Sequence, residues 1–231
     1  MIDSAAELAR NLERVRAGIG RAADRAGRDP AAVMLVAVAK GQPAGAVRLA
    51  AEAGLTDIGE NYVNELAAKR EDLGERDLRW HFVGALQSST AHRVADLADV
   101  VHSVGSRHAA ERLGARADRE VRRVPVLLQV DFTGTRNGVG PEDAADEAAW
   151  LRDLPGIDLR GLMTLPPWTD DPEGARPYFR RLRDLREAVA RGPDDLRELS
   201  MGMSGDYEVA VEEGATMVRI GTALFGARPT E

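Results

Sequence analysis

The chain has 231 residues, which suits one large domain or two small ones, and its 44% hydrophobic and 30% charged residues argue against disorder as the main state. A net charge of -7 argues against a general surface for nucleic acids or anionic membranes. With no cysteine, no signal-peptide pattern and no apolar run near the roughly 20 residues of a membrane helix, we expect a cytoplasmic protein without disulfides or zinc–sulfur sites.

A helix is expected near the N-terminus, because Ser4 can cap it and apolar residues follow at steps of three and four. These residues are Leu8, Leu12, Val15, Ile19 and Ala22. The stretch 33–39 that comes next is apolar at every position. A strand that is apolar on both faces is typical of a parallel sheet covered by helices.

Short β-type runs and helical patterns then alternate to the end of the chain. Further strands are expected at 56–59, 80–84, 100–104, 124–131, 159–164, 196–201 and 216–221. Helices are expected at 44–53, 61–73, 90–97, 106–120, 141–152, 173–190 and 205–213. Such alternation indicates parallel strands joined by right-handed crossovers. The pattern predicts an α/β fold, a single (β/α)8 TIM barrel over residues 1–231 with an extra N-terminal helix; the alternative is an open doubly wound sheet.

Active sites of such barrels lie at the C-terminal ends of the strands, and the first strand ends in Lys40. A lysine that ends a wholly apolar strand faces the barrel mouth or the edge of the core. Burial there favours the neutral amine that forms a Schiff base. The alternative is a lysine whose stem lies on the rim and whose ammonium group is in water.

Two polar residues near other strands have a plain structural interpretation beside the functional one. Asn61 follows the second strand and either hydrogen-bonds a ligand or caps the next helix. His81 lies within the third strand, where a hydrogen-bonded interior histidine is commoner than a catalyst.

Glycine and hydroxyl residues fill the turns after the last two strands, at 200–206 and 219–222. Small residues allow close backbone approach, and these two loops are the usual phosphate site of such barrels. The alternative is that Ser204 only caps its helix. Arg219 lies near the end of the eighth strand and needs an acceptor, which could be a carboxylate, a phosphate or a ring nitrogen. A reactive lysine together with a phosphate site formed by these two turns suggests pyridoxal 5'-phosphate (PLP).

Other chemistries find no motif in the sequence. The four histidines have no metal-binding spacing, so no metal site is expected. No nucleophile elbow, P-loop or dinucleotide fingerprint is present. The segment 133–140 is interpreted as a mobile glycine-rich loop.

Six stretches, in chain order, carry a resemblance to a known family: 36–40 (VAVAK), 57–65 (DIGENYVNE), 80–88 (WHFVGALQS), 160–164 (RGLMT), 199–204 (LSMGMS) and 217–226 (MVRIGTALFG). The chain resembles the YggS/PROSC (PLPBP) family of PLP homeostasis proteins, whose fold is similar to the N-terminal barrel domain of alanine racemase. Two segments depart from the usual family pattern, Ser89-Thr90 where Asn-Lys is usual and Arg136-Asn137 in place of a Lys-x-Gly loop.

The resemblance implies a role for each residue of the site. Lys40 would hold PLP as a Schiff base, with Asn61 near the ring and Arg219 near the pyridine nitrogen. The phosphate would be held by Ser204, Gly221 and Thr222.

The function implied is intracellular PLP (vitamin B6) homeostasis with little or no turnover, including delivery to PLP-accepting apoenzymes. A cationic arginine beside the ring nitrogen disfavours its protonation, so the ring is a poorer electron sink. One alternative is a PLP-dependent amino-acid racemase with Lys40 as its only base, for which Tyr62 or His81 would be weak second proton donors. Another is a cofactor-free barrel enzyme that forms a Schiff base with a sugar phosphate. The low aromatic content, 4%, favours a monomer.

Overall fold

The computed structural model describes residues 4–74 and 76–227. Its strands are β1 (Met34–Val38), β2 (Asp57–Glu60), β3 (Arg79–Phe82), β4 (Val100–Val104), β5 (Val124–Val130), β6 (Ile157–Thr164), β7 (Glu198–Ser200) and β8 (Met217–Ile220). Its α-helices are α1 (Ala5–Arg25), α2 (Ala44–Glu52), α3 (Val63–Leu73), α4 (Ala91–Leu97), α5 (Arg107–Arg119), α6 (Ala144–Asp153), α7 (Arg176–Val189), α8 (Tyr207–Glu212) and α9 (Thr222–Phe225).

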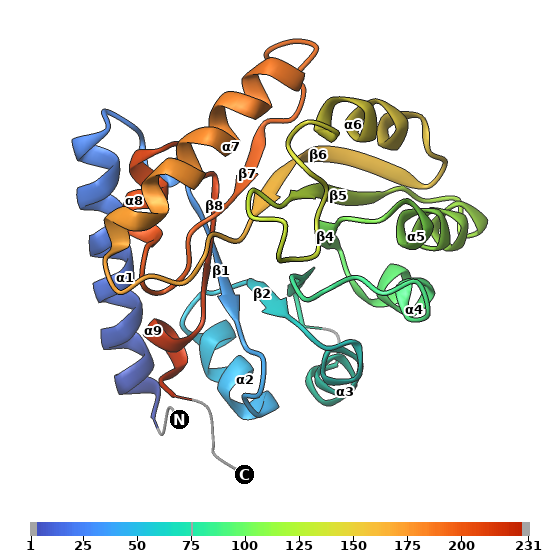
Figure 1. Cartoon of the computed structure of the whole chain (residues 1–231). Helices are drawn as coiled ribbons and strands as arrows, with labels where there is room; N and C mark the ends of the chain where they lie inside the picture. Colours follow the sequence, from blue (N-terminus) through green and yellow to red (C-terminus); the bar gives the residue numbers. More distant parts are fainter. Residues whose placement is uncertain (1–3, 75, 228–231) are drawn as a thin grey trace.

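The eight strands form one closed parallel barrel, in which each strand pairs with its neighbours in chain order (Figure 1). Closure is made by β1 and β8, whose register runs from Met34 opposite Met217 to Ala37 opposite Ile220. An open doubly wound sheet would leave these two strands apart. The predicted (β/α)8 barrel is therefore confirmed.

The apolar core has two parts, because side chains along a strand alternate in direction. A large cluster lies between the barrel and its helices and includes Leu128 and Leu162. Leu127, Met163 and Met217 form a separate small cluster. Since Leu127 and Met163 are direct neighbours of the helix-facing leucines, their side chains point into the barrel.

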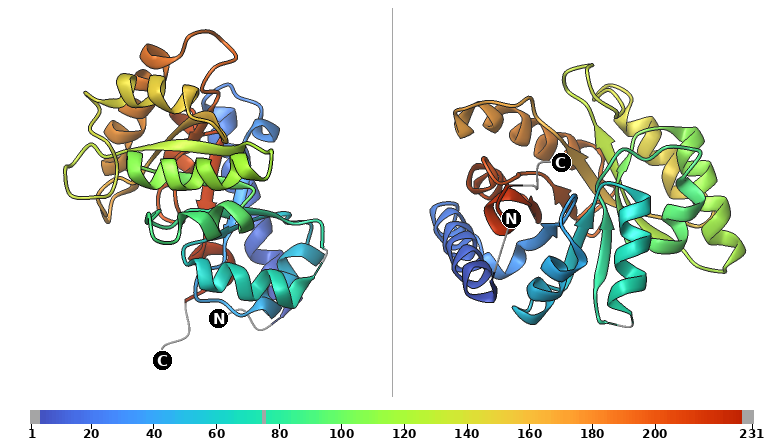
Figure 2. Two further views of the ribbon diagram at one scale, coloured as in Figure 1. Left: turned by 90° about the vertical axis from the view of Figure 1, so that its right-hand side faces the viewer. Right: turned by 90° about the horizontal axis from the view of Figure 1, so that it is seen from below.

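The extra N-terminal helix is present as α1, and Ser4 caps it by accepting a hydrogen bond from the Glu7 backbone N–H at 3.2 Å. The helix lies outside the barrel along α8 and α9 (Figures 1 and 2). Helix α7 begins at Arg176 rather than at residue 173, since Pro177 favours the first turn of a helix and a 3-10 turn at Pro172–Ala175 precedes it.

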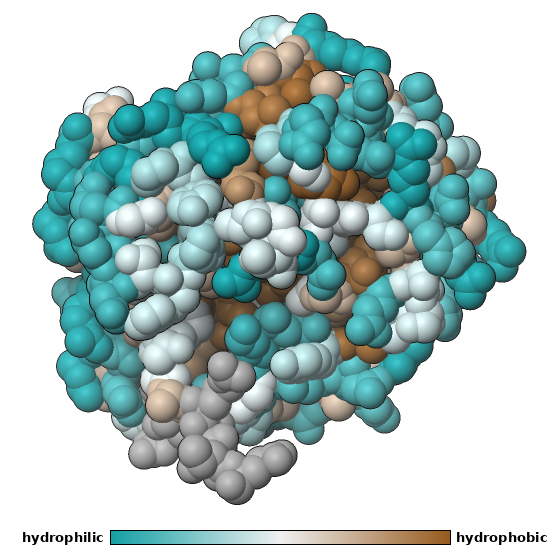
Figure 3. Space-filling view, in the orientation of Figure 1, coloured by the Kyte–Doolittle hydropathy of each residue, from teal (hydrophilic) through white to brown (hydrophobic). Residues whose placement is uncertain are grey.

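The surface seen in Figure 3 is mostly hydrophilic at its periphery, and hydrophobic residues are visible in the recesses between polar side chains. Within residues 4–74 and 76–227, no helix has the length and apolarity needed to cross a membrane.

Candidate functional site

The barrel brings the predicted site residues to the same end of four adjacent strands. Strands β7, β8, β1 and β2 are consecutive around the barrel, and each carries part of the predicted set at or just beyond its C-terminal end. The residues so gathered are Lys40, Asn61, Ser204, Arg219, Gly221 and Thr222.

Lys40 follows β1 after one buried residue, Ala39, and is itself half-buried. The Ala39 N–H donates to the Gly59 carbonyl at 2.9 Å, which extends the β1–β2 pairing to the residue before the lysine. The chain then turns sharply through Gly41, whose φ of 68° lies in the left-handed region that favours glycine. The turn places Lys40 at the barrel mouth, as the sequence predicts.

A buried ion cluster holds the backbone on both sides of Lys40. The Lys69 ammonium lies 2.8 Å from the Ala39 carbonyl oxygen and 2.5 Å from Glu60 Oε1. It also lies 3.2 Å from Glu65 Oε2, which accepts a hydrogen bond from the Gly41 N–H at 2.8 Å. One ammonium and one carboxylate therefore fix the peptide groups that flank Lys40.

Glu60 is the most buried member of this cluster. Burial raises its pKa from 4.5 to about 7, although the charge of Lys69 and its hydrogen bond oppose the shift. Its second oxygen, Oε2, is buried without a hydrogen-bond partner. The sequence analysis missed this cluster, yet one signal was available: Lys69 falls on the buried face of α3, in step with Leu66 and Leu73.

Asn61 directly follows β2, and its side-chain oxygen is buried without a hydrogen-bond partner. The N-cap of α3 is Tyr62, so Asn61 does not take the capping role considered for it. Gly84 packs against it so closely that a Cβ there would lie 2.0 Å from the Asn61 carbonyl oxygen. A buried amide oxygen without a partner is available to a ligand donor.

The turns after β7 and β8 meet at Ser204. Its Oγ accepts hydrogen bonds from the backbone N–H groups of Gly221, at 3.3 Å, and Ala223, at 3.2 Å. Ser204 therefore does not cap α8, whose N-cap is Asp206. The hydroxyl residue Thr222 begins α9 and is exposed. Backbone N–H groups and hydroxyls at one place are the donor set that suits a phosphate.

Arg219 is only 4% exposed and lies inside the barrel. Its Nη1 donates to Ser200 Oγ at 2.6 Å, and its Nη2 donates to the Thr164 carbonyl oxygen at 3.0 Å. Burial lowers the pKa of Arg219 to about 10, a shift that the charge of Asp206 partly offsets. The guanidinium is thus charged at neutral pH and oriented by β6 and β7. The sequence did not reveal these two partners.

His81 is fully buried and hydrogen-bonded at both ring nitrogens. Its Nδ1 lies 2.8 Å from Nε2 of His102, and its Nε2 lies 3.0 Å from Oδ1 of Asp57. The interpretation of His81 as a satisfied interior histidine is confirmed.

The glycine-rich loop after β5 is organised by a carboxylate. Asp131 accepts hydrogen bonds from the backbone N–H groups of Thr133, at 2.8 Å, and Arg136, at 2.7 Å. Within the residues that the structure describes, no group of three potential metal ligands comes together.

Comparison with known proteins connects this barrel with PLP. The sequence matches the family described as "Alanine racemase, N-terminal domain" over residues 9–229. It is 45% identical over 223 residues to the pyridoxal phosphate homeostasis protein of Pseudomonas aeruginosa, with 96% of each chain covered. The protein of that name from Aquifex aeolicus is 41% identical over 220 residues, covering 94% of this chain and 96% of the relative.

Solved structures show the same architecture. PipY of Synechococcus elongatus with PLP bound matches with a TM-score of 0.84 and 37% identity, covering 95% of this chain and all of PipY. Alanine racemase of Clostridium difficile matches with a TM-score of 0.74 at 17% identity and shares the fold over 58% of its own length.

Proposed function

The chain belongs to the family of pyridoxal phosphate homeostasis proteins, within the broader alanine racemase N-terminal-domain family, and from this premise we propose that it binds PLP at the barrel mouth and acts in cytoplasmic PLP homeostasis. The observation that carries the proposal is the meeting of a lysine amine and a set of phosphate donors at the ends of adjacent strands. PLP needs both, because it has an aldehyde at one side of its ring and a phosphate at the other.

The residues at the mouth fit this ligand. Ser204 Oγ accepts from the Gly221 and Ala223 N–H groups, which leaves its own hydrogen to donate to a phosphate beside the hydroxyl of Thr222. Gly221 also needs its small size, because a Cβ there would lie 3.2 Å from the Val38 carbonyl oxygen. The side-chain oxygen of Asn61, which has no hydrogen-bond partner, can accept a hydrogen bond from a ligand at the barrel mouth.

The sequence limits where a Schiff base can form. It contains two lysines, Lys40 and Lys69. Lys69 is buried, and its ammonium contacts three oxygen atoms, from Ala39, Glu60 and Glu65. A Schiff base needs a neutral, accessible amine, so these contacts favour Lys40 as the attachment point.

Bound PLP supplies an aldehyde that condenses with an amine and a ring that can withdraw electrons. We assign Arg219 to the pyridine nitrogen, because it is a buried cation on β8, two residues before Gly221. A charged donor at that nitrogen disfavours its protonation and weakens the ring as an electron sink. The site thus favours holding PLP over carbanion chemistry.

We propose a carrier that delivers PLP to accepting apoenzymes, rather than a racemase. Racemisation by two bases needs a second proton donor at the site. His81 does not suit this role, because both of its ring nitrogens are hydrogen-bonded inside the barrel. Tyr62 is 56% exposed and so is not enclosed within the barrel.

The test is an absorption spectrum of the protein with PLP, followed by assays of transfer and turnover. The wild type should develop a visible band that Lys40→Ala lacks, should restore a PLP-dependent apoenzyme, and should leave L-alanine unracemised. A band of equal strength in Lys40→Ala would contradict the assignment, and rapid racemisation would favour the enzyme.

A further inference from the structure

A chain of hydrogen-bonded side chains crosses the inside of the barrel and ends at Arg219. It begins at Asp57 on β2, whose Oδ1 lies 3.0 Å from Nε2 of His81 on β3. His81 Nδ1 lies 2.8 Å from Nε2 of His102 on β4, and His102 Nδ1 lies 2.8 Å from Oγ of Ser200 on β7. Ser200 accepts the hydrogen bond from Arg219 on β8. Five side chains from five strands form one continuous path.

With both imidazoles neutral, the two ends of this path fix the direction of every hydrogen bond within it. A guanidinium only donates and a carboxylate only accepts. Ser200 accepts from Arg219, and its own hydrogen is available for His102 Nδ1. A neutral His102 then carries its hydrogen on Nε2 and donates to His81, which donates from its own Nε2 to Asp57. Each donor has an acceptor, and the opposite tautomer of His102 would need a second proton on His81.

Burial and charge support this arrangement. Burial lowers the pKa of His102 well below its ordinary value, a charge on His81 would lower it further, and the charges of Arg219 and Arg79 act in the same direction. His102 is therefore neutral. Burial tends to raise the pKa of Asp57, but its hydrogen bonds from His81 and Arg79 and the charge of Arg79 lower it below its ordinary value.

Other charged groups face the path from the elements packed around it. Arg79 on β3 donates to Asp57 Oδ1 at 2.9 Å. Burial lowers the pKa of Arg219, and the charge of Asp206, in the loop after β7, raises it in part. Burial raises the pKa of Glu198 at the start of β7, and the charge of Arg79 lowers it less strongly. The carboxylate of Asp57 is the one that is hydrogen-bonded into the path.

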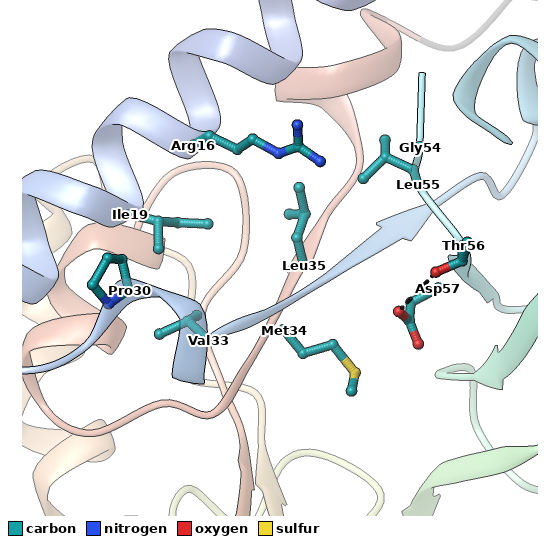
Figure 4. Close-up of a pocket in the computed structure, with 10 residues that line it drawn as sticks. All are labelled: Arg16, Ile19, Pro30, Val33, Met34, Leu35, Gly54, Leu55, Thr56 and Asp57. Carbon is teal, nitrogen blue, oxygen red and sulfur yellow. Dashed lines mark hydrogen bonds between the residues drawn. The ribbon is translucent and has the colours of Figure 1, made fainter. Parts of the chain in front are cut away.

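The Asp57 end is open to solvent, whereas the histidines are fully buried. The Asp57 side chain is 21% exposed and lines a pocket of about 340 Å³ at the N-terminal ends of β1 and β2. Figure 4 shows this pocket, with Arg16 reaching over it from α1 and Asp57 at its far side. The path thus joins a solvent-accessible carboxylate at one end of the barrel to the buried guanidinium of Arg219.

We propose that Asp57, His81 and His102 are positioning residues that hold the Arg219 guanidinium in one orientation and transmit the charge of Asp57 to it, and so to the ring nitrogen of bound PLP. The inference rests on the proposed function, because it takes PLP as the ligand beside Arg219. Coupled hydrogen bonds in a low-dielectric interior polarise one another, which gives the path its effect over several side chains.

The tautomers of the wild-type protein test the path without any ligand. Long-range proton–nitrogen correlation spectra of the imidazoles, recorded on the wild-type protein without added PLP at about pH 7.5, above the ordinary histidine pKa of about 6.5, should show a hydrogen on Nε2 of both His81 and His102. Spectra of His81→Gln and His102→Gln assign the signals among the four histidines. A His102 ring protonated on Nδ1 would overturn the proposed direction.

The coupling to the ligand is tested by the spectrum of bound PLP as a function of pH. Asp57→Asn keeps the size of the side chain and removes its charge. It should move the midpoint of the spectral titration by about half a pH unit or more. The matched control is Asp158→Asn. Asp158 is also a carboxylate at the N-terminal end of a strand, 33% exposed, and it is paired with Arg160 at 2.6 Å rather than with the path.

The outcomes distinguish failure of the proposed path from failure of the proposed PLP-binding function. A shift in Asp57→Asn that Asp158→Asn lacks supports the path. Identical titrations of the wild type and Asp57→Asn, or equal shifts in both variants, would overturn it. If no protein develops the PLP band, the proposed function fails as well, and the missing wild-type band identifies that case. If Asp57→Asn does not fold, the wild-type tautomers still decide the direction of the path.

Discussion

Lysine occurs twice in this chain, and the two side chains have opposite surroundings. Lys40 is half-buried at the barrel mouth, whereas Lys69 lies under the same turn with its ammonium contacting the Ala39 carbonyl and two carboxylates. The buried lysine holds the backbone that carries the other one. The cluster therefore links the stability of the turn to the position of Lys40, the residue proposed to bind PLP.

The pH dependence of stability should reveal the raised pKa of Glu60. Burial raises the pKa of this residue in the native protein from 4.5 to about 7. Between these values the native state keeps a proton that the unfolded state has lost, so the free energy of unfolding falls as pH rises, by up to roughly 3 kcal/mol. Urea unfolding across this range should show a smaller fall for Glu60→Gln. The exposed Glu71→Gln on the same helix is the control, and equal slopes in all three proteins would contradict the assignment.

Replacement of Lys69 should be costly. Lys69→Met leaves the Glu60 carboxyl buried without its cation and the Ala39 carbonyl without its donor. We expect a loss of about 3–5 kcal/mol in the free energy of unfolding. The double variant Glu60→Gln/Lys69→Met should lose less than Lys69→Met alone, because no buried charge is left unpaired. Simple additivity of the two single changes would argue against a coupled pair.

The location of a single residue could be predicted from the sequence where the residue lies at the end of a predicted strand. Lys40 ends a strand that is apolar throughout, and the phosphate turns follow the last two strands, so their location at the barrel mouth follows from the order of the strands. The partners of Arg219 were not predictable in this way. Ser200 and the Thr164 carbonyl meet Arg219 through the register of three strands, which a one-dimensional pattern does not contain.

At the scale of the elements, we propose that the turns after β7 and β8 together bind the phosphate of PLP. Thr222→Ala removes a hydroxyl donor at the start of α9. A hydrogen bond to a charged group is worth about 1.5–3 kcal/mol, so we expect PLP to bind at least about tenfold more weakly. Equilibrium titration of the absorption band measures the change. Ser106→Ala removes an exposed hydroxyl after β4, across the barrel from β8, and should bind PLP as the wild type does. Equal affinity of Thr222→Ala and the wild type would show that the Thr222 hydroxyl does not bind the phosphate.

The longer elements follow from the sequence, and the short ones do not. The all-apolar run 33–39 and the helical periodicity from Leu8 to Ala22 each extend over several residues and gave β1 and α1. Helix α9 spans four residues, too few to show a helical period, and it was not expected. Strand β7 is reduced to Glu198–Ser200, because the chain turns away from the sheet at Gly202, with a φ of 91°.

At the scale of the whole molecule, an arginine–glutamate network joins the outer helices. Glu213, at the end of α8, accepts hydrogen bonds from Arg176, Arg180 and Arg183 of α7. Glu212 connects the same layer to Arg25 of α1. Burial tends to raise the pKa of Glu213, but the hydrogen bonds from Arg180 and Arg176 lower it below 4.5.

Acid should therefore weaken this outer layer. A carboxylate with a lowered native pKa stabilises the protein above its ordinary pKa of 4.5, and this contribution is lost as pH falls through the native value. Glu213→Gln should be less stable than the wild type at neutral pH. Its free energy of unfolding should fall less steeply than that of the wild type as the pH drops below 4.5. A steeper fall in the variant would contradict the account. The control is Glu187→Gln, an exposed residue of α7.

The most direct measurement of the central claim is to trap the attachment point of PLP. The protein is incubated with PLP, reduced with borohydride and digested, and the modified peptide is identified by mass spectrometry. The account predicts a pyridoxyl group on Lys40 in the wild type and its loss in Lys40→Ala, with an unchanged circular dichroism spectrum. A label on Lys69 or on the N-terminal amine, or the same label after the substitution, would contradict it.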